Sequence, residues 1–497
     1  LDVWSLAGFA GLVLIALVPV AYGKFDGVRL LPWGRPILGF HLGFFDHAYP
    51  KEPLLWSGMV LLLVWAAGRG LFRPGSGKGL RVLPFYLCAL AAGWLFSPWP
   101  QLGLPRFAED AALALFAILA SAAIRRPAVR EHAPEFLALA FLPAAAISIL
   151  TQSGGIVFAA PAGNPNVAAN LFLLPALVSA GSSLSARAEG DFRRFLLRAV
   201  ACLVFAITLV ASRSEGALIA LVAGVAFLAW RIGPKPDASI AFAGIAVAMV
   251  LAFLLAGRVA GGSNPGKVLQ ASTIGTRILL WESAGRAFET SPARLIAGFG
   301  PGSSPCALAL RPAPGLPCNR WAAESETHPH SEPIRTLFES GIAGVAALAF
   351  LVFPLLGRFS QGSALAAGVQ AGVAALLVSG AGCVPLGEPA NRAILFLSIG
   401  ALAGLRAAAR GETPPQAGLA RGFSLATAAG ALWVLLVPGK FLAEREMSAA
   451  AAARAAKRPE SALPMLARAA ARGTPLLAFR ARMTSAEPTI GSARERS

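Results

Sequence analysis

Charge is scarce in this sequence. Only 14% of its 497 residues are Asp, Glu, Lys or Arg, whereas soluble globular proteins carry about 25%. Hydrophobic residues make up 56%, and the mean hydropathy is +0.64. A water-soluble globular domain is therefore excluded. Apolar runs near the ~20-residue length that crosses a bilayer recur along the chain and indicate an integral membrane protein.

Signatures of several other functions are also missing. The sequence has no Asp-x-Asp pair for a metal-bound nucleotide sugar, and its few acidic residues form no evident metal cage. The stretch "RPGSGKGL" at 73–80 has Gly79 where a phosphate-binding loop needs Ser or Thr. No basic-aromatic module accompanies the net charge of +18. We therefore expect no nucleic-acid partner, no metal and no cofactor.

The apolar runs predict an all-α polytopic membrane protein with about 12–13 transmembrane helices. The expected spans are 5–23, 54–72, 82–99, 107–124, 134–151, 166–181, 195–211, 216–231, 238–258, 336–357, 363–384, 390–405 and 423–442. No basic segment precedes the first run and the cleavage site after it is poor, so we expect a membrane helix there rather than a signal peptide.

Lys and Arg gather in every second loop. With a cytoplasmic N-terminus the basic loops all lie on the cytoplasmic side, as the positive-inside rule requires. The long polar insertion between spans nine and ten then faces outward, into the periplasm of a Gram-negative cell. The expected parts are spans one to nine, a periplasmic loop with an amphipathic helix, spans ten to thirteen, and a periplasmic Ala- and Arg-rich helical tail, at 1–258, 259–335, 336–442 and 443–497.

Two short polar segments and the long loop emerge on this same outward side. The short segments are "AGNPNVAAN" (162–170) and "ASRSEGA" (211–217). Arg213 lies in so short a loop that its guanidinium must sit near the membrane rim, where a charge usually has a partner. It either snorkels and pairs with Glu215 or binds an anion, since a guanidinium forks onto phosphate oxygens.

The long loop contains "TIGTRILLWESAGRAFE" (273–289), whose spacing predicts an amphipathic helix at the membrane surface. Arg277 on this helix is either a solvated surface residue or a second anion ligand. Trp281 either anchors the helix at the interface, which we favour, or stacks on a sugar face.

Two of the five histidines, His328 and His330, stand at the end of the loop. Ser331 can cap the helix that follows, and Pro333 suits its first turn. A helix over 332–357 is roughly 38 Å long at 1.5 Å per residue, so its start projects above the ~30 Å hydrocarbon core. The positive end of this helix favours a neutral, proton-accepting imidazole at His330. Solvent exposure is the alternative, and the simpler interpretation for His328.

Cysteine is rare, with five residues, and Cys306 and Cys318 bracket "ALALRPAPGLP" in the long loop. In an oxidising compartment this spacing suggests a disulfide, which would restrict the loop by about 3 kcal/mol in the chain-entropy estimate. Two free thiols are the alternative.

His330, ten intervening residues and Gly341, after a large outward loop, resemble the signature of the O-antigen ligase and polymerase superfamily. Other blocks are similar to that superfamily's recurring motifs: "GNPN" at 163–166, "SRS" at 212–214, "TRILLWESA" at 276–284 and "GFGPG" at 298–302. The resemblance covers roughly 160–405, and the first few spans match in hydropathy alone.

The resemblance implies a GT-C-like, multi-pass protein of the bacterial inner membrane: a metal-independent glycosyltransferase with its active site facing the periplasm. A glycan on undecaprenyl pyrophosphate would pass to an acceptor hydroxyl, on lipid A–core for a ligase, with inversion at the anomeric carbon. His330 would deprotonate that hydroxyl, and Arg213 and Arg277 would neutralise the pyrophosphate. Gly341 and Gly344 would let the helix pack closely against a neighbour. Supporting or acceptor-side candidates are His328, Asn166, Glu215, Trp281, Gly300 and Gly341.

Alternatives remain open. A polymerase that joins repeat units and a protein O-oligosaccharyltransferase that uses a Ser or Thr hydroxyl share the donor half of the site. A lipid-linked sugar transporter is the alternative of another class. Carriers place ionisable residues and broken helices at the bilayer midplane, whereas the spans here hold almost no interior charge. We therefore favour an enzyme, with the lipid-linked donor, a glycan acceptor and membrane lipids as its partners.

Overall fold

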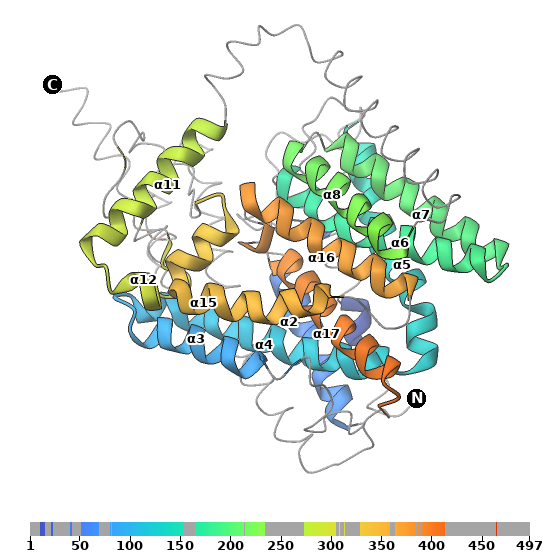
Figure 1. The fold of residues 1–497 in the computed structure, drawn as a ribbon, viewed down its shortest axis with the longest axis horizontal. Helices are drawn as coiled ribbons and strands as arrows, with labels where there is room; N and C mark the ends of the chain where they lie inside the picture. The colour runs from blue at the N-terminus through green and yellow to red at the C-terminus, as the bar shows by residue number, and fades with distance from the viewer. Residues whose placement is uncertain are drawn as a thin grey trace, which may run out of the picture.

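The computed structural model of this protein is almost wholly helical where it describes the chain (Figure 1). The described residues are 10–14, 21–22, 40–41, 51–68, 80, 82–152, 165–212, 214–233, 273–304, 308, 313, 329–357, 363–383, 385–387, 389–412 and 464. The helices are α2 Lys51–Gly68, α3 Leu83–Leu95, α4 Pro100–Ile124, α5 Pro127–Gln152, α6 Pro165–Ala188, α7 Phe192–Ala211, α8 Glu215–Ile232, α11 Thr273–Thr290, α12 Arg294–Ala297, α15 Glu332–Leu356, α16 Ala364–Gly382, the 3-10 helix η3 Pro385–Gly387 and α17 Pro389–Ala409. Two short strands, β1 Ala21–Tyr22 and β2 Phe40–His41, pair in parallel.

Within the described residues, seven helices are long and apolar enough to cross a membrane. They are Arg106–Ile124, Ala168–Ala188, Phe192–Ala211, Glu215–Ile232, Glu332–Leu356, Ala364–Gly382 and Ala390–Ala409. Each overlaps one of the predicted spans, so the polytopic, helical class is confirmed. The predicted spans 54–72, 82–99 and 134–151 are helical too, in α2, α3 and α5.

Other predictions fall outside the described residues. These are the spans 238–258 and 423–442, most of 5–23, and nearly all of the tail 443–497. The total of about 12–13 spans therefore remains a prediction from hydropathy.

Glycines let α4 and α17 approach until their backbones almost touch. A Cβ built on Gly400 of α17 would lie 2.1 Å from the carbonyl oxygen of Ala117, and one on Gly404 would lie 2.4 Å from that of Ser121. Residue numbers rise together along this contact, so the two helices run parallel.

Helices α6 and α16, in contrast, pack against each other while running in opposite directions. A Cβ on Gly372 of α16 would meet Leu174, and one on Gly368 would meet Leu177, so these helices run antiparallel. The fourth and twelfth predicted spans thus share one direction, while the sixth and eleventh have opposite directions. Both directions agree with the prediction, made from the distribution of Lys and Arg among the loops, that successive spans cross the membrane in alternating directions.

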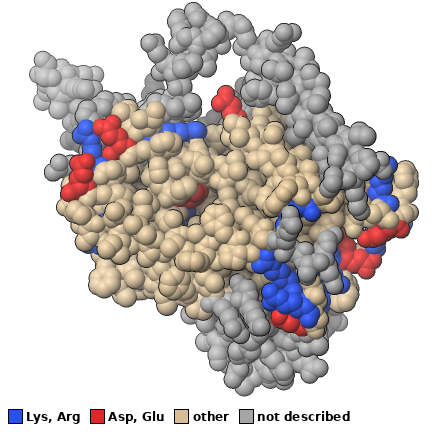
Figure 2. All heavy atoms as spheres, in the orientation of Figure 1, with Lys and Arg blue, Asp and Glu red and all other residues tan. Residues whose placement is uncertain are grey.

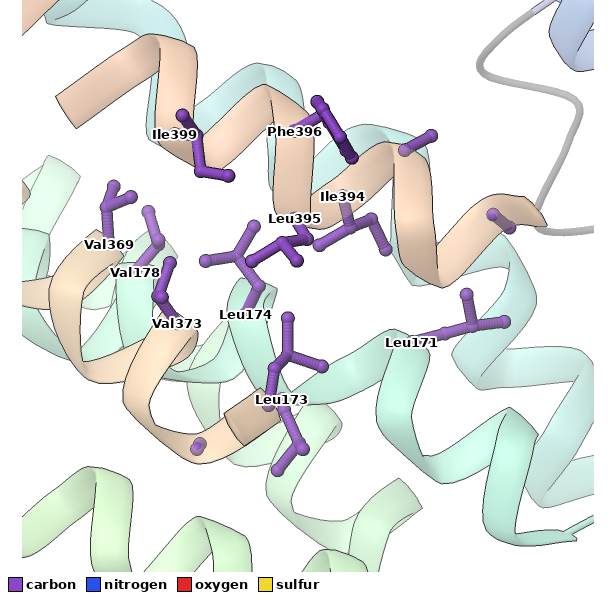
Figure 3. Close-up of a cluster of buried hydrophobic side chains, with 14 of the residues drawn as sticks. Leu171, Leu173, Leu174, Val178, Val369, Val373, Ile394, Leu395, Phe396 and Ile399 are labelled. Atoms are coloured by element: carbon purple, nitrogen blue, oxygen red, sulfur yellow. The ribbon is translucent and has the colours of Figure 1, made fainter. Parts of the chain in front are cut away.

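One cluster of the buried hydrophobic core lies where α6, α16 and α17 meet (Figure 3). Leu174 and Val178 of α6, Val373 of α16, and Phe396 and Ile399 of α17 are all buried there. Lipid is as apolar as these side chains, so close packing rather than removal from water stabilises such contacts within a membrane.

Charged side chains gather towards the two ends of the molecule, with a broad and largely uncharged zone between them (Figure 2). At one end Arg231 of α8 and Arg406 of α17 donate hydrogen bonds of 2.7 and 3.1 Å to the carbonyl oxygen of Gly357, just after α15. The ends of α8, α15 and α17 therefore meet here, and their starts lie together at the opposite end. We call that opposite end, where α4 and α6 also begin, the outer end.

Candidate functional site

Helix α15 is broken at Gly341. This residue has φ +63° and ψ −169°, a conformation that few residues other than glycine adopt. Residues 332–340 form a short half-helix at the outer end, bent away from the rest of α15 (Figure 1). The predicted limits of this helix, 332–357, are confirmed to within one residue, but the expected straight rod of 38 Å is wrong.

The turn "GFGPG" packs into the break. In an unbroken helix, each carbonyl oxygen accepts a hydrogen bond from the N–H group four residues later in the chain. A break in the helix removes some of these donors. Here the N–H groups of Phe299 and Gly300 donate to the carbonyl oxygens of Phe338 and Glu339, at 2.8 and 2.9 Å. The Gly-rich turn thereby satisfies carbonyls beside the break.

Two glycines predicted to support the site are required by this packing. A Cβ on Gly341 would lie 2.1 Å from the Ile296 carbonyl oxygen, and one on Gly300, which has φ +106°, would lie 2.3 Å from Ser97 Oγ. For Gly344, however, the nearest atoms belong to Ser340 of its own helix. Its expected contact with a neighbouring helix is therefore wrong.

Aromatic side chains hold this region together. Phe288 of α11, Phe299 of the turn and Phe338 of the half-helix have ring centroids 4.8–5.5 Å apart. We call α11, α12, the turn 298–304 and the half-helix 332–340 the outer cap. The helix predicted over 273–289 is confirmed as α11.

His330 enters the half-helix with an unusual backbone. Its φ is +50°, and no other non-glycine residue among those described has a positive φ. Such strain costs about 1–3 kcal/mol and persists only where the surroundings impose it. The indole N–H of Trp281 donates to the carbonyl oxygen of Pro329 at 2.7 Å, and Ser331 occupies the N-cap position without a side-chain capping bond. The half-buried His330 is therefore held between α11 and α15.

Arg277 does not lie on the solvated face of α11. It is half-buried, and its Nη1 lies 3.7 Å from the Cβ position of Gly382, at the end of α16. Residues four apart share a helix face, so Arg277 and Trp281 lie on the same side of α11, where Trp281 is 36% exposed. The end of α16 is the negative end of its dipole, which favours a cation. Arg286, on the opposite face of α11, pairs with Glu282 at the surface.

The "GNPN" and "SRS" blocks are brought together. Ser214 Oγ donates to Asn166 Oδ1 at 2.7 Å, which joins the start of α8 to the start of α6. Ser214 also caps α8 by accepting from the Ala217 N–H, and its own N–H donates to Ser212 Oγ. The positions on both sides of Arg213 are thereby fixed, although Arg213 itself lies outside the described residues.

The remaining predicted residues divide into two groups. Glu215 is the exposed first residue of α8, where an acid stabilises the helix dipole. His328, Cys306 and Cys318 lie outside the described residues, so their roles, and the disulfide, remain predictions.

A buried ionic group at the outer end overturns the expectation that the spans hold almost no interior charge. Arg392 of α17 pairs with Glu109 and Asp110 of α4 at 2.7 and 3.3 Å, and Arg106 lies 3.7 and 3.9 Å from the same two acids. These residues stand near the starts of their spans rather than at the midplane. Hydropathy windows missed them because a few charges beside a long apolar run barely change the average.

A second buried ionic group lies in the half-helix. Arg335 pairs with Glu332 at 2.7 Å and with Glu339 at 3.4 Å. Their spacing of three and four residues is the usual one for pairs along a helix, and this signal was available in the sequence. In the part of the chain that the structure describes, no set of three or more His, Cys, Asp or Glu side chains is placed to hold a metal ion.

Comparison with known proteins identifies a family that matches part of the chain. Residues 200–349 match the family model described as "O-Antigen ligase", and no curated protein matches the chain. The matched range contains the "SRS" turn, α11, the Gly-rich turn, His330 and the break at Gly341. The resemblance predicted from the motifs is confirmed for residues 200–349, which are similar to the O-antigen ligase family.

Proposed function

We propose that this protein is a metal-independent, inverting O-antigen ligase that moves a glycan from undecaprenyl pyrophosphate to a hydroxyl of lipid A–core. The observation that carries the proposal is the strained His330, held at the outer end by the Trp281–Pro329 hydrogen bond and by α15. The match of residues 200–349 to the O-antigen ligase family model supports glycosyltransferase chemistry for the site that contains it.

In the proposed reaction, the imidazole of His330 accepts the proton of the acceptor hydroxyl. The hydroxyl oxygen attacks the anomeric carbon from the face opposite the pyrophosphate, which gives inversion. The bond from that carbon to the pyrophosphate oxygen breaks, and undecaprenyl pyrophosphate leaves with the bonding electrons. The proton on His330 then returns to solvent.

Negative charge grows on the departing pyrophosphate, so fixed cations beside it lower the barrier. Arg277 and Arg213 fill this role in the proposal, because a guanidinium binds two phosphate oxygens at once. The half-buried position of Arg277 against the end of α16 supports its part. The Asn166–Ser214 bond supports that of Arg213 by fixing the turn around it.

We further propose that the chain lies in the bacterial inner membrane with its outer end in the periplasm. Arg231 and Arg406 at the opposite end support this orientation, since basic residues concentrate on the cytoplasmic side. The division at 1–258, 259–335, 336–442 and 443–497 is retained as a proposal. Its third part then begins inside the half-helix, which packs with the loop in the outer cap.

The decisive experiment uses purified protein in detergent with undecaprenyl-pyrophosphate glycan and lipid A–core, in the presence of EDTA. A gel shift of the core band supports the ligase, and loss of that shift on adding EDTA contradicts metal independence. Lengthening of the donor identifies a polymerase, and glycan on a Ser- or Thr-containing peptide identifies an O-oligosaccharyltransferase. Folded protein that does none of these, but carries the lipid-linked sugar across liposomes, is a transporter.

The role of Arg277 can be separated from a general effect on α11. We expect Arg277→Ala to lower kcat/KM by about 10²-fold, since removing one group that stabilises transition-state charge has effects of this size. Arg277→Lys should recover only part, because an ammonium lacks the planar fork. Arg286→Ala is the matched control on the opposite face of the same helix and should leave transfer unchanged. Equal losses in the Arg277 and Arg286 variants would contradict the assignment.

Loss of the hydrogen bond from Trp281 should lower glycan transfer less than loss of the Arg277 guanidinium. We expect Trp281→Phe, which keeps a ring but loses the donor, to lower kcat about fivefold, because one hydrogen bond contributes about 1 kcal/mol. Trp94→Phe removes the same kind of bond, from an indole N–H to the Pro100 carbonyl oxygen at 2.8 Å. Steady-state transfer rates should fall in the first variant and not in the second. An unchanged rate in Trp281→Phe would show that this bond does not hold His330.

A further inference from the structure

The ionic group of the half-helix connects the position next to His330 with the Gly-rich turn. Arg335 Nε donates to Glu332 Oε2 at 2.8 Å, its Nη2 lies 2.7 Å from the same oxygen, and its Nη1 donates to Glu339 Oε2 at 3.4 Å. The other oxygen of Glu339 accepts from Ser304 Oγ at 2.7 Å. A chain of polar contacts therefore runs from two residues after His330 to the end of the turn 298–304.

The backbone of Arg335 is part of the same connection. Its N–H donates to the carbonyl oxygen of Ser331 at 2.8 Å, which is a first-turn hydrogen bond of the half-helix. Ser331 directly follows His330, so the conformation of Arg335 bears on the residue that orients the imidazole. Arg335 is only 7% exposed, and side chains buried to this degree have few alternative rotamers.

The half-helix needs such support. It is only about nine residues long, and helices shorter than about 12–15 residues are marginal by themselves. The break at Gly341 also separates it from the long apolar part of α15, which the bundle holds. Its position therefore depends on its side chains and on the Gly-rich turn.

Stability alone explains this ionic group poorly. Replacing a buried ion pair by apolar residues is often neutral or stabilising, and such pairs are better understood where they select one conformation. Among the described residues, the buried Glu332 Oε1 makes no hydrogen bond, and an unsatisfied buried oxygen costs free energy.

We propose that Arg335 is a positioning residue for His330: its contacts with Glu332 and Glu339 lock the half-helix to the Gly-rich turn and so fix the imidazole. The inference rests on the proposed function, in which His330 is the general base. Arg335 acts through the helix and has no contact with substrate.

Arg335→Lys tests this proposal with the charge retained and the fork removed. We expect kcat for glycan transfer to fall about 20-fold, while the apparent KM for the donor stays within about twofold, because positioning errors chiefly affect the chemical step. Ser304→Ala, which cuts only the far end of the chain of contacts, should give a smaller loss in kcat of about threefold. Arg198→Lys is the matched control, since Arg198 is equally buried and ion-paired with Glu135, but at the end opposite the outer cap.

Two further measurements test whether Arg335 fixes His330 without relying on glycan transfer. Hydrogen–deuterium exchange of 331–340, and the rate at which diethyl pyrocarbonate modifies His330, should both rise about tenfold in Arg335→Lys and stay unchanged in Arg198→Lys. Unchanged exchange and modification in Arg335→Lys would overturn the inference, as would an equal loss of kcat in Arg198→Lys. If the wild-type protein transfers no glycan, the proposed function fails, while exchange and modification still decide whether Arg335 fixes His330.

Discussion

His330→Ala should abolish glycan transfer in protein that still folds and still binds the donor. The expected loss in kcat is about 10³-fold, within the range for removal of a general base. Alanine is found less often than histidine at a φ near +50°, so this exchange removes the imidazole and does not relieve the backbone. His330→Asn separates the two effects further, because Asn tolerates the left-handed region better and yet cannot act as the base. Both variants should be equally inactive.

The measurement is single-turnover transfer to lipid A–core at saturating donor, with donor binding measured separately. His132→Ala is the control, since His132 is exposed on α5 and should transfer at the wild-type rate. Transfer above about a tenth of the wild-type rate in His330→Ala would exclude general-base catalysis by this residue. Activity in His330→Asn with none in His330→Ala would instead assign the loss to the backbone.

The helices and turns of this site could be predicted from the sequence better than the contacts between them. Apolar runs predicted the helices of the described bundle, and the motif blocks marked α11, the turn "GFGPG" and the start of α15, which pack together in the outer cap. Hydropathy and motif spacing succeed here because span length and local turn chemistry are properties of short segments.

Contacts between distant segments were not predictable in the same way. The Ser214–Asn166 and Trp281–Pro329 bonds join residues 48 positions apart, and nothing in either segment alone specifies its partner. Trp281 in particular fitted an interfacial anchor equally well, because an indole on an amphipathic helix serves both purposes. The buried group around Arg392 was missed for a related reason: a single Arg near the start of a span gives no sign of the acids on another helix.

The break at Gly341 also could not be predicted from its own segment of the sequence. A glycine inside an apolar helix permits close packing or a break, and both depend on its missing side chain. Only the approach of α12 and the Gly-rich turn distinguishes them, since the Ile296 carbonyl oxygen occupies the space that a side chain would need.

Gly341→Ala should therefore be among the most damaging small substitutions in the outer cap. The added Cβ would lie 2.1 Å from a backbone oxygen at a residue with φ +63° and ψ −169°. A side chain in such a conformation costs about 1–3 kcal/mol before any clash is counted, and a backbone atom cannot move aside as a flexible side chain can. We expect glycan transfer to fall at least about 10²-fold, because displacement of the reacting group by 1 Å has effects of this size.

Gly285→Ala is the matched control, since Gly285 lies in α11 with nothing within 4 Å of its Cβ position. Alanine in a helix interior is favoured over glycine by about 0.5–1 kcal/mol, so this variant should be at least as stable as the wild type and fully active. The measurements are thermal unfolding in detergent and hydrogen–deuterium exchange of 331–340 and 298–304. Faster exchange of both segments in Gly341→Ala, with the core of α6, α16 and α17 unaffected, would show that the break docks the half-helix against the turn. Wild-type transfer by Gly341→Ala would mean that the placement of His330 does not depend on the break.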